Sequence, residues 1–209
     1  MKVFLGLCMS YVIGSIPTAF LFGKYYRNID IRQHGSGNVG ATNAFRVLGK
    51  IPGSLVLFVD ILKGIICVTL VGSFLGFDKV FLRILLGLFA VIGHNWTCFL
   101  KFKGGKGIAT TLGVLIGLAI HVPQLGIVVL ISCLIWTVVF LLSGYVSLAS
   151  IIAAIFMPLL MVAKDQPFEI KILGVIFCIF VVLRHKPNLK RLFLGTESRV
   201  KFPFPPKRH

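Results

Sequence analysis

Residues 81–121 read FLRILLGLFAVIGHNWTCFLKFKGGKGIATTLGVLIGLAIH, and this stretch decides the fold class. Two apolar runs flank a short connection, residues 101–107, that contains three lysines and three glycines. The first run is long enough for a helix that crosses a hydrocarbon core of roughly 30 Å, which takes about 20 residues. The stretch therefore predicts membrane helices joined by a basic, glycine-rich loop.

The same alternation extends along the whole chain. The hydrophobic fraction is 57% and the charged fraction 13%, whereas a soluble domain has roughly 45–50% and about 25%. We expect an all-α polytopic membrane protein with seven transmembrane helices. If the closely spaced pair of apolar segments at 107–142 does not form two spans, the number is five. We expect a single transmembrane domain at 1–199 and a basic cytoplasmic tail at 200–209. The predicted spans are 3–22, 53–76, 81–100, 107–121, 125–142, 147–163 and 170–183.

The net charge of +16 has an asymmetric distribution. Of the 22 Lys and Arg residues, sixteen fall on one side of the predicted spans, five on the other, and Lys63 lies within a span. Cytoplasmic loops of membrane proteins carry this excess, so we expect the N-terminus outside and the C-terminus in the cytoplasm. The charges are not on a soluble face, so nucleic-acid binding is not expected. The cysteines form no CxxC pair, and we expect neither a metal site nor a disulfide framework.

Three polar segments follow spans on the predicted cytoplasmic side. The first is glycine-rich, so its backbone N–H groups can approach a ligand closely, and it ends on an arginine suited to phosphate. Its candidate phosphate-binding residues are Gly35, Ser36, Gly37, Asn38, Thr42, Asn43 and Arg46.

The second segment, residues 101–111, has Gly-Gly-Lys-Gly directly before an apolar helix. Successive glycine N–H groups, a lysine and a helix N-terminus together resemble a phosphate-binding nest. It is not a nucleotide P-loop, which requires Ser or Thr after the lysine. The candidate residues here are Gly104, Gly105, Lys106 and Gly107.

The third segment begins with Arg184-His185-Lys186 and includes the acid Glu197. His185 could act as an acid or a base, whereas Glu197 is more plausible as a partner of an arginine. Asp60 and Lys63 lie three residues apart within a span and so share a helix face. Charges at that depth are costly and often functional, so the pair could be structural, or Lys63 could contact a substrate.

These segments together resemble the bacterial acyl-phosphate-dependent glycerol-3-phosphate acyltransferases, the PlsY family. The tail beyond Arg199 is longer than the family needs. The matching motifs run in order across nearly the whole chain. They are residues 14–17 (GSIP), 35–46, 60–64 (DILKG), 93–94 (GH), 102–110 (FKGGKGIAT), 145–150 (YVSLAS) and 184–197, with Arg184, His185, Asn188, Arg191 and Glu197.

The resemblance implies seven helices with an active site at the cytoplasmic face of a bacterial plasma membrane. It implies acyl transfer from acyl phosphate to the 1-hydroxyl of glycerol 3-phosphate, which yields lysophosphatidate and phosphate without metal, cofactor or acyl-CoA. Ser36, Arg46, Lys106, His185 and Asn188 would be catalytic. The first two glycine-rich segments and Lys63 would hold phosphate, and Asp60 and Glu197 would be structural. Beyond its substrates and membrane lipids we expect no partner, and hence a monomer.

Two alternatives remain open from the residues. A substrate phosphate oxygen could replace His185 as the base. A membrane transporter of a phosphate-bearing anion would use the same basic loops, although the chain lacks the internal repeat common in transporters. The His-x-x-x-x-Asp motif of many other acyltransferases does not occur after any of the five histidines.

Overall fold

The structure is a computed structural model that describes residues 1–200, and the final part of the expected tail, 201–209, lies outside the described residues. Within residues 1–200 the secondary structure is helical throughout. The α-helices are α1 (Lys2–Ser15), α2 (Thr18–Arg27), α3 (Ala41–Leu48), α4 (Lys50–Ile66), α5 (Gly72–Phe74), α6 (Val80–Asn95), α7 (Ile108–Ala119), α8 (Leu125–Ser143), α9 (Val146–Ala163), α10 (Phe168–Arg184) and α11 (Lys186–Phe193). Short 3-10 turns cover Ile31–Gln33 and Cys98–Leu100, and a π-helix at Cys67–Val71 joins α4 to α5.

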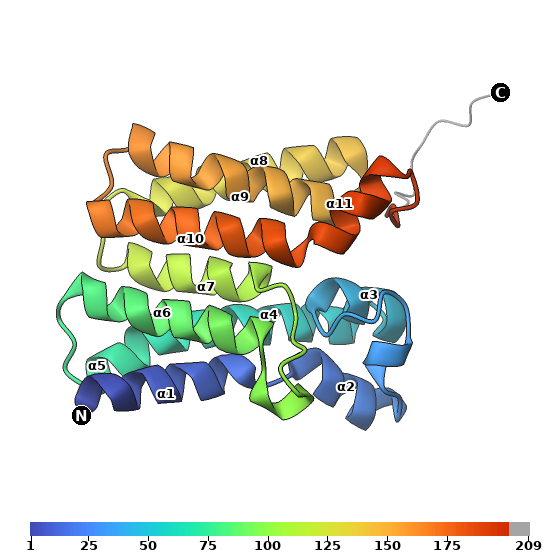
Figure 1. The fold of residues 1–209 in the computed structure, drawn as a ribbon, viewed down its shortest axis with the longest axis horizontal. Coiled ribbons are helices and arrows are strands. Elements are labelled where there is room, and N and C mark those ends of the chain that lie inside the picture. Colours follow the sequence, from blue (N-terminus) through green and yellow to red (C-terminus); the bar gives the residue numbers. More distant parts are fainter. Residues whose placement is uncertain (201–209) are drawn as a thin grey trace.

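The apolar helices α1, α4, α6, α7, α8, α9 and α10 run side by side as one bundle (Figure 1). Within residues 1–200, five helical segments are long and apolar enough to cross a membrane, and α7 is a shorter apolar helix. The predicted all-α membrane fold is confirmed. The described chain begins at one end of the bundle and finishes at the other, as an odd number of crossings requires (Figure 1).

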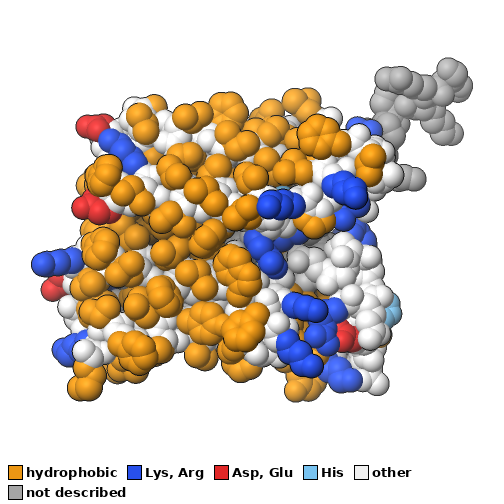
Figure 2. Space-filling view, viewed as in Figure 1, with side chains coloured by type: hydrophobic (Ala, Val, Ile, Leu, Met, Phe, Trp, Pro, Cys, Tyr) orange, Lys and Arg blue, Asp and Glu red, His pale blue; other side chains and the backbone are white. Residues whose placement is uncertain are grey.

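Polar elements gather at one end of this bundle. The helices α2, α3 and α11 and the loop before α7 lie there, and we call this the basic end (Figure 1). Figure 2 shows an apolar flank along the bundle, with many Lys and Arg side chains grouped at the basic end. The three glycine-rich and basic segments are thus brought together in space, although they are far apart in sequence.

The first predicted span, 3–22, is not one straight helix. It breaks at Ile16-Pro17, so that α1 ends at Ser15 and α2 begins at Thr18. Proline lacks an N–H and disfavours a helical conformation in the residue before it. The Ile16 carbonyl instead accepts hydrogen bonds from the Thr18 N–H at 3.0 Å and from Lys63 Nζ at 2.5 Å.

Glycines allow two pairs of helices to pack with their backbones in contact. A Cβ on Gly14 of α1 would lie 2.0 Å from the Ala90 carbonyl oxygen of α6. A Cβ on Gly113 of α7 would lie 1.9 Å from the Ile61 carbonyl oxygen of α4. Small residues at such positions favour close helix packing in membranes, where dispersion contacts replace the hydrophobic effect.

We predict that Gly113→Ala lowers the free energy of unfolding in detergent by about 1–3 kcal/mol, because the added methyl group forces α4 and α7 apart. The matched control is Gly126→Ala on α8, where a Cβ would meet nothing within 4 Å. Since alanine has the higher helix propensity, the control is expected to be neutral or stabilising by up to about 1 kcal/mol. Unfolding titrations in mixed detergent and denaturant measure both, and equal losses would contradict close α4–α7 packing.

Candidate active site

The first segment is organised by Asn43, which is fully buried at the start of α3. Its Oδ1 accepts a hydrogen bond from the Ser36 N–H at 2.8 Å, and its Nδ2 donates to the carbonyls of His34 (3.0 Å) and Ile31 (3.3 Å). Gly35, with φ +62°, passes so close that a Cβ would lie 2.3 Å from Asn43 Oδ1. Asn43, a predicted phosphate ligand, here has its amide engaged by the backbone of its own loop.

The other polar side chains of this segment remain available to a ligand. Within residues 1–200, no hydrogen bond is made by the side chains of Ser36, Asn38, Thr42 and Arg46. Gly37 takes φ +71°, which allows the loop to turn back toward α3. Arg46 lies near enough to Lys106 for its charge to lower the pKa of that lysine. The first and second segments therefore lie within electrostatic range of one another at the basic end.

The second segment is a loop whose backbone is held on both sides. The Gly105 N–H donates to the His94 carbonyl at 3.0 Å, and the Gly104 N–H donates to the Asn95 carbonyl at 3.2 Å. The carbonyls of both glycines accept hydrogen bonds from Arg184, at 2.8 to 3.1 Å. These two N–H groups, expected to hold phosphate, are thus engaged with the end of α6.

Free backbone donors are found one step further along the chain. Gly107, with φ +77°, precedes the first residue of α7, Ile108. Within the described residues the N–H groups of positions 108–110 have no hydrogen-bond partner. The N-terminus of a helix attracts anions through such donors and through the helix dipole. The phosphate-binding nest predicted at this loop stays a prediction, and the backbone donors without a partner belong to the start of α7.

The third segment joins the second through a chain of hydrogen bonds. Lys106 Nζ donates to Asn188 Oδ1. Asn188 Nδ2 donates to Glu197 Oε1 at 2.6 Å, and Ser147 Oγ donates to the same oxygen at 2.7 Å. Arg191 Nε donates to Glu197 Oε2 at 2.7 Å. Glu197 therefore ties α11 to the start of α9 and, through Asn188, orients Lys106.

His185 is buried beside this chain, with 3% of its surface exposed. Its Nδ1 lies 2.8 Å from the Val181 carbonyl, which can only accept, so Nδ1 carries the proton and Nε2 carries the lone pair. Burial, followed by the nearby charge of Lys106, lowers the pKa of His185 to about 4. His185 is therefore neutral at pH 7 and can accept a hydrogen bond through Nε2.

The charges around Lys106 make this end of the protein a site for anions. Burial lowers the pKa of Lys106 to about 8, Glu197 raises it, and the nearby cations Arg191, Arg184 and Arg46 lower it further. Four cations and one carboxylate leave an excess of positive charge, which a phosphate would compensate. Arg184 was not among the predicted site residues. Its position next to His185 was a signal, but its contacts with the glycine loop depend on tertiary packing.

Lys63 and Asp60 lie buried inside the bundle on α4. Lys63 is 3% exposed, and its Nζ donates to Asp60 Oδ1 at 2.6 Å and to Thr18 Oγ1 at 2.5 Å. Its three donors are engaged by Asp60, Thr18 and Ile16, so binding of phosphate by Lys63 stays a prediction.

Within residues 1–200, no group of three or more His, Cys, Asp or Glu side chains is arranged to hold a metal ion.

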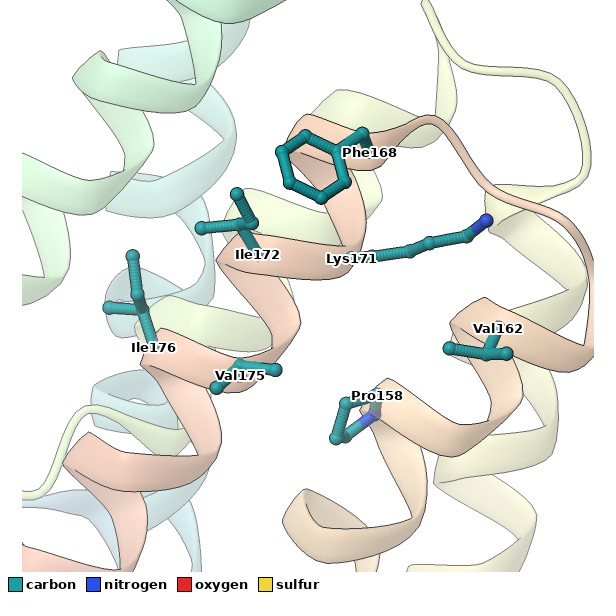
Figure 3. A pocket seen from close by; sticks show the side chains of 7 residues that line it. All are labelled: Pro158, Val162, Phe168, Lys171, Ile172, Val175 and Ile176. Carbon is teal, nitrogen blue, oxygen red and sulfur yellow. The ribbon is translucent and has the colours of Figure 1, made fainter.

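A surface groove between α9 and α10 is not part of this site. Figure 3 shows a groove of about 290 Å³ between α9 and α10, lined by Pro158, Val162, Phe168, Lys171, Ile172, Val175 and Ile176. It lies toward the end of the bundle opposite the basic end (Figure 1), and its lining is apolar apart from Lys171, which pairs with Asp165. A membrane-facing groove of this kind fits lipid chains better than a phosphate ester.

The fold is that of an integral membrane protein whose polar residues gather in a cationic cluster at one end. The sequence matches the glycerol-3-phosphate acyltransferase family over residues 4–195. It is 45% identical to "Glycerol-3-phosphate acyltransferase 2" of Moorella thermoacetica, over 94% of this chain and 96% of the relative. It is 40% identical to "Glycerol-3-phosphate acyltransferase" of Fusobacterium nucleatum, over 97% of this chain and 100% of the relative.

Solved structures agree with the sequence relatives. Crystal structures of PlsY (YgiH), an integral membrane glycerol 3-phosphate acyltransferase, match over 96% of both chains. The glycerol 3-phosphate form has a TM-score of 0.87 at 37% identity, and the lysophosphatidic acid form has 0.84 at 36%. This chain belongs to the glycerol-3-phosphate acyltransferase family, as its sequence motifs predicted.

We predict that Glu197→Gln destabilises the protein at pH 7 by about 1–3 kcal/mol, the typical contribution of hydrogen bonds to a charged group. Although burial raises the pKa of Glu197, hydrogen bonds from Ser147, Asn188 and Arg191 outweigh burial and lower it below the ordinary value of 4.5. The stabilising contribution is therefore present above pH 4.5 and is lost as the pH falls through the lowered pKa. Thermal unfolding in detergent between pH 3 and pH 7 measures this difference.

The control for this measurement is Glu169→Gln, which removes an exposed acid in the first turn of α10. It is expected to change stability by less than about 1 kcal/mol. A Glu197→Gln variant as stable as the wild type at pH 7 would contradict a stabilising role for the hydrogen bonds that Glu197 accepts.

Proposed function

We propose that this protein transfers a fatty acyl group from acyl phosphate to the 1-hydroxyl of sn-glycerol 3-phosphate. The observation that carries the proposal is the grouping of Arg46, Arg184 and Arg191, with the single carboxylate of Glu197, around Lys106 at the basic end. Both substrates are anions, one soluble and one with a lipid tail, so a cationic site at a membrane interface can receive each from its own phase. Glycerol 3-phosphate and lysophosphatidic acid, named for the two related PlsY structures, are the acceptor and product of this reaction.

The reaction requires little covalent chemistry from the protein. The acceptor hydroxyl oxygen attacks the acyl carbon, the bond from that carbon to the phosphate oxygen breaks, and phosphate leaves with the electron pair. Because the mixed anhydride is already activated, the protein needs neither a covalent intermediate nor a metal or cofactor. Its contribution is to hold two phosphates close together and to stabilise the charge that develops on oxygen.

The residues divide this work between them. Lys106, Arg46 and the open N–H groups at the start of α7 would hold the phosphate of glycerol 3-phosphate, and Ser36 would add its hydroxyl group. Asn188 would orient Lys106. His185 Nε2 carries the lone pair needed to accept the hydroxyl proton. A pKa of about 4 makes it a weak base, and a phosphate oxygen of a bound substrate is the alternative acceptor of that proton.

The excess of Lys and Arg at the basic end supports a location in a bacterial plasma membrane with this end in the cytoplasm. Acyl phosphate and glycerol 3-phosphate would then meet at the inner surface, and lysophosphatidate would remain in that leaflet.

The decisive experiment incubates purified protein in detergent with acyl phosphate and labelled glycerol 3-phosphate and follows both products. We expect turnover with acyl phosphate and none with acyl-CoA. Ser36→Ala and Lys106→Ala are expected to lower kcat/KM about 100- to 1,000-fold, because each removes a group that stabilises the reacting phosphates. Lys171→Ala, at the opposite end, is the control with unchanged activity.

The outcomes separate the alternatives. Full activity of His185→Ala would assign the proton to a substrate phosphate. If folded wild-type protein binds glycerol 3-phosphate but makes no product, the proposed acyl transfer is wrong. Transport of a phosphate-bearing anion would then be favoured.

The pKa of Lys106 predicts a pH dependence of substrate binding. The free ammonium loses its charge as the pH rises through about 8, so KM for glycerol 3-phosphate should rise by up to about tenfold per pH unit above that value. Between pH 7.5 and 9.5 the substrate phosphate is a dianion throughout, since its second pKa is near 6. Lys106→Arg stays charged, so its KM should remain flat over this range. Parallel profiles for both proteins would contradict the prediction.

A further inference from the structure

A buried cluster of charged and polar groups lies directly beneath the glycine loop. It consists of Thr18, Asp60, Lys63 and His94, whose exposed fractions lie between 1% and 8%. Lys63 Nζ and Thr18 Oγ1 both donate to Asp60 Oδ1, at 2.6 and 2.9 Å. His94 Nδ1 faces the same carboxylate oxygen at 3.9 Å. Three helices and the α1–α2 break thus converge on one carboxylate.

His94 connects this cluster to the glycine loop. Its carbonyl accepts from the Gly105 N–H, and its ring lies against Gly105 on the side away from Asp60. A Cβ on Gly105 would lie 2.2 Å from His94 Nε2, and the three atoms nearest to it all belong to the imidazole. Residue 105 must therefore be glycine because this histidine fills the space, and the imidazole determines how near the loop comes to α6.

Lys106 is the next residue after Gly105, so a shift of this loop moves the ammonium and the start of α7. The loop is clamped between the His94 side and the Arg184 side, where the guanidinium holds the carbonyls of Gly104 and Gly105. Arg184 belongs to the basic end. The His94 side is supported by Thr18, Asp60 and Lys63, whose exposed fractions are 1% to 4%.

We propose that Asp60 and Lys63, acting through the His94 imidazole, are positioning residues that set the affinity of the glycine loop for glycerol 3-phosphate. This deepens the proposed function and rests on it for the identity of the ligand. A purely structural pair would instead stabilise the α1–α2 break alone, through Lys63 and the Ile16 carbonyl, and would leave ligand affinity unchanged in the folded protein.

The test measures the Kd of glycerol 3-phosphate by calorimetry on folded, detergent-purified protein, together with KM for each substrate. We expect His94→Ala and Asp60→Asn each to raise the Kd and the KM for glycerol 3-phosphate by about tenfold or more, as supporting residues of binding sites typically do. KM for acyl phosphate should change less than about twofold. His94→Gln, which retains a polar side chain facing Asp60, should recover part of the loss.

Two pairs of variants test the route through His94. Asp60→Asn should add less than about twofold in the His94→Ala background, because the imidazole that transmits its effect is absent. Gly105→Ala should weaken binding severely by itself, whereas His94→Ala combined with Gly105→Ala should bind better than Gly105→Ala alone, since the methyl group then has room.

The matched control is Arg83→Met, which removes a buried charge at the far end of α6. Arg83 is 5% exposed and donates to the Val68 carbonyl at 2.7 Å. It should lower the unfolding temperature as much as Asp60→Asn does while leaving the Kd unchanged. Additive effects of Asp60→Asn and His94→Ala, or a wild-type Kd in either, would overturn the inference.

The Kd also separates this inference from the proposed reaction. If the wild type binds glycerol 3-phosphate but makes no product, the proposed reaction fails and the Kd values still decide the role of the cluster. If the wild type does not bind glycerol 3-phosphate, both proposals are wrong.

Discussion

In hydrocarbon every backbone N–H and C=O group must find its hydrogen-bond partner within the protein, and this constraint governs the whole structure. The α1–α2 break and the π-helix interrupt two of the predicted spans, and each interruption is met by a buried cation. At the α1–α2 break Lys63 donates to the Ile16 carbonyl. At the π-helix Cys67–Val71, Arg83 donates to the carbonyls of Val68 and Thr69. Charges that are costly in a membrane are thus used to complete the backbone.

The same requirement explains why the polar loops occupy one end. A loop rich in glycine and free N–H groups cannot face lipid, so the three segments can only assemble where the bundle meets water. There the backbone is again satisfied by side chains from other segments: Asn43 supports the loop of Ser36, and Arg184 supports the carbonyls of the glycine loop. The donors left open at the start of α7 are those best placed for an anion.

The cationic cluster is held in place by very few acids. Glu197 accepts hydrogen bonds from Ser147, Asn188 and Arg191, and so connects α9 and α11 to Lys106. Asp60 plays a comparable part below the loop, with Lys63 and Thr18 as its donors. Both carboxylates are engaged by the protein itself, which leaves Arg46, the α7 N-terminus and the Lys106 donors not directed at Asn188 to bind substrate.

The sequence alone determined the membrane class, the helical bundle and the gathering of three polar segments on one side, because apolar length and charge asymmetry reflect the surrounding solvent and not any particular contact. It also indicated Lys106, His185, Asn188 and Glu197 through their motifs. Only the tertiary structure decided which atoms meet. Asn43 supports the loop of Ser36, the Gly104 and Gly105 N–H groups donate to carbonyls of α6, and Lys63 donates to the Ile16 carbonyl. These hydrogen bonds join residues brought together by helix packing, and a linear pattern contains no information about which donor faces which acceptor.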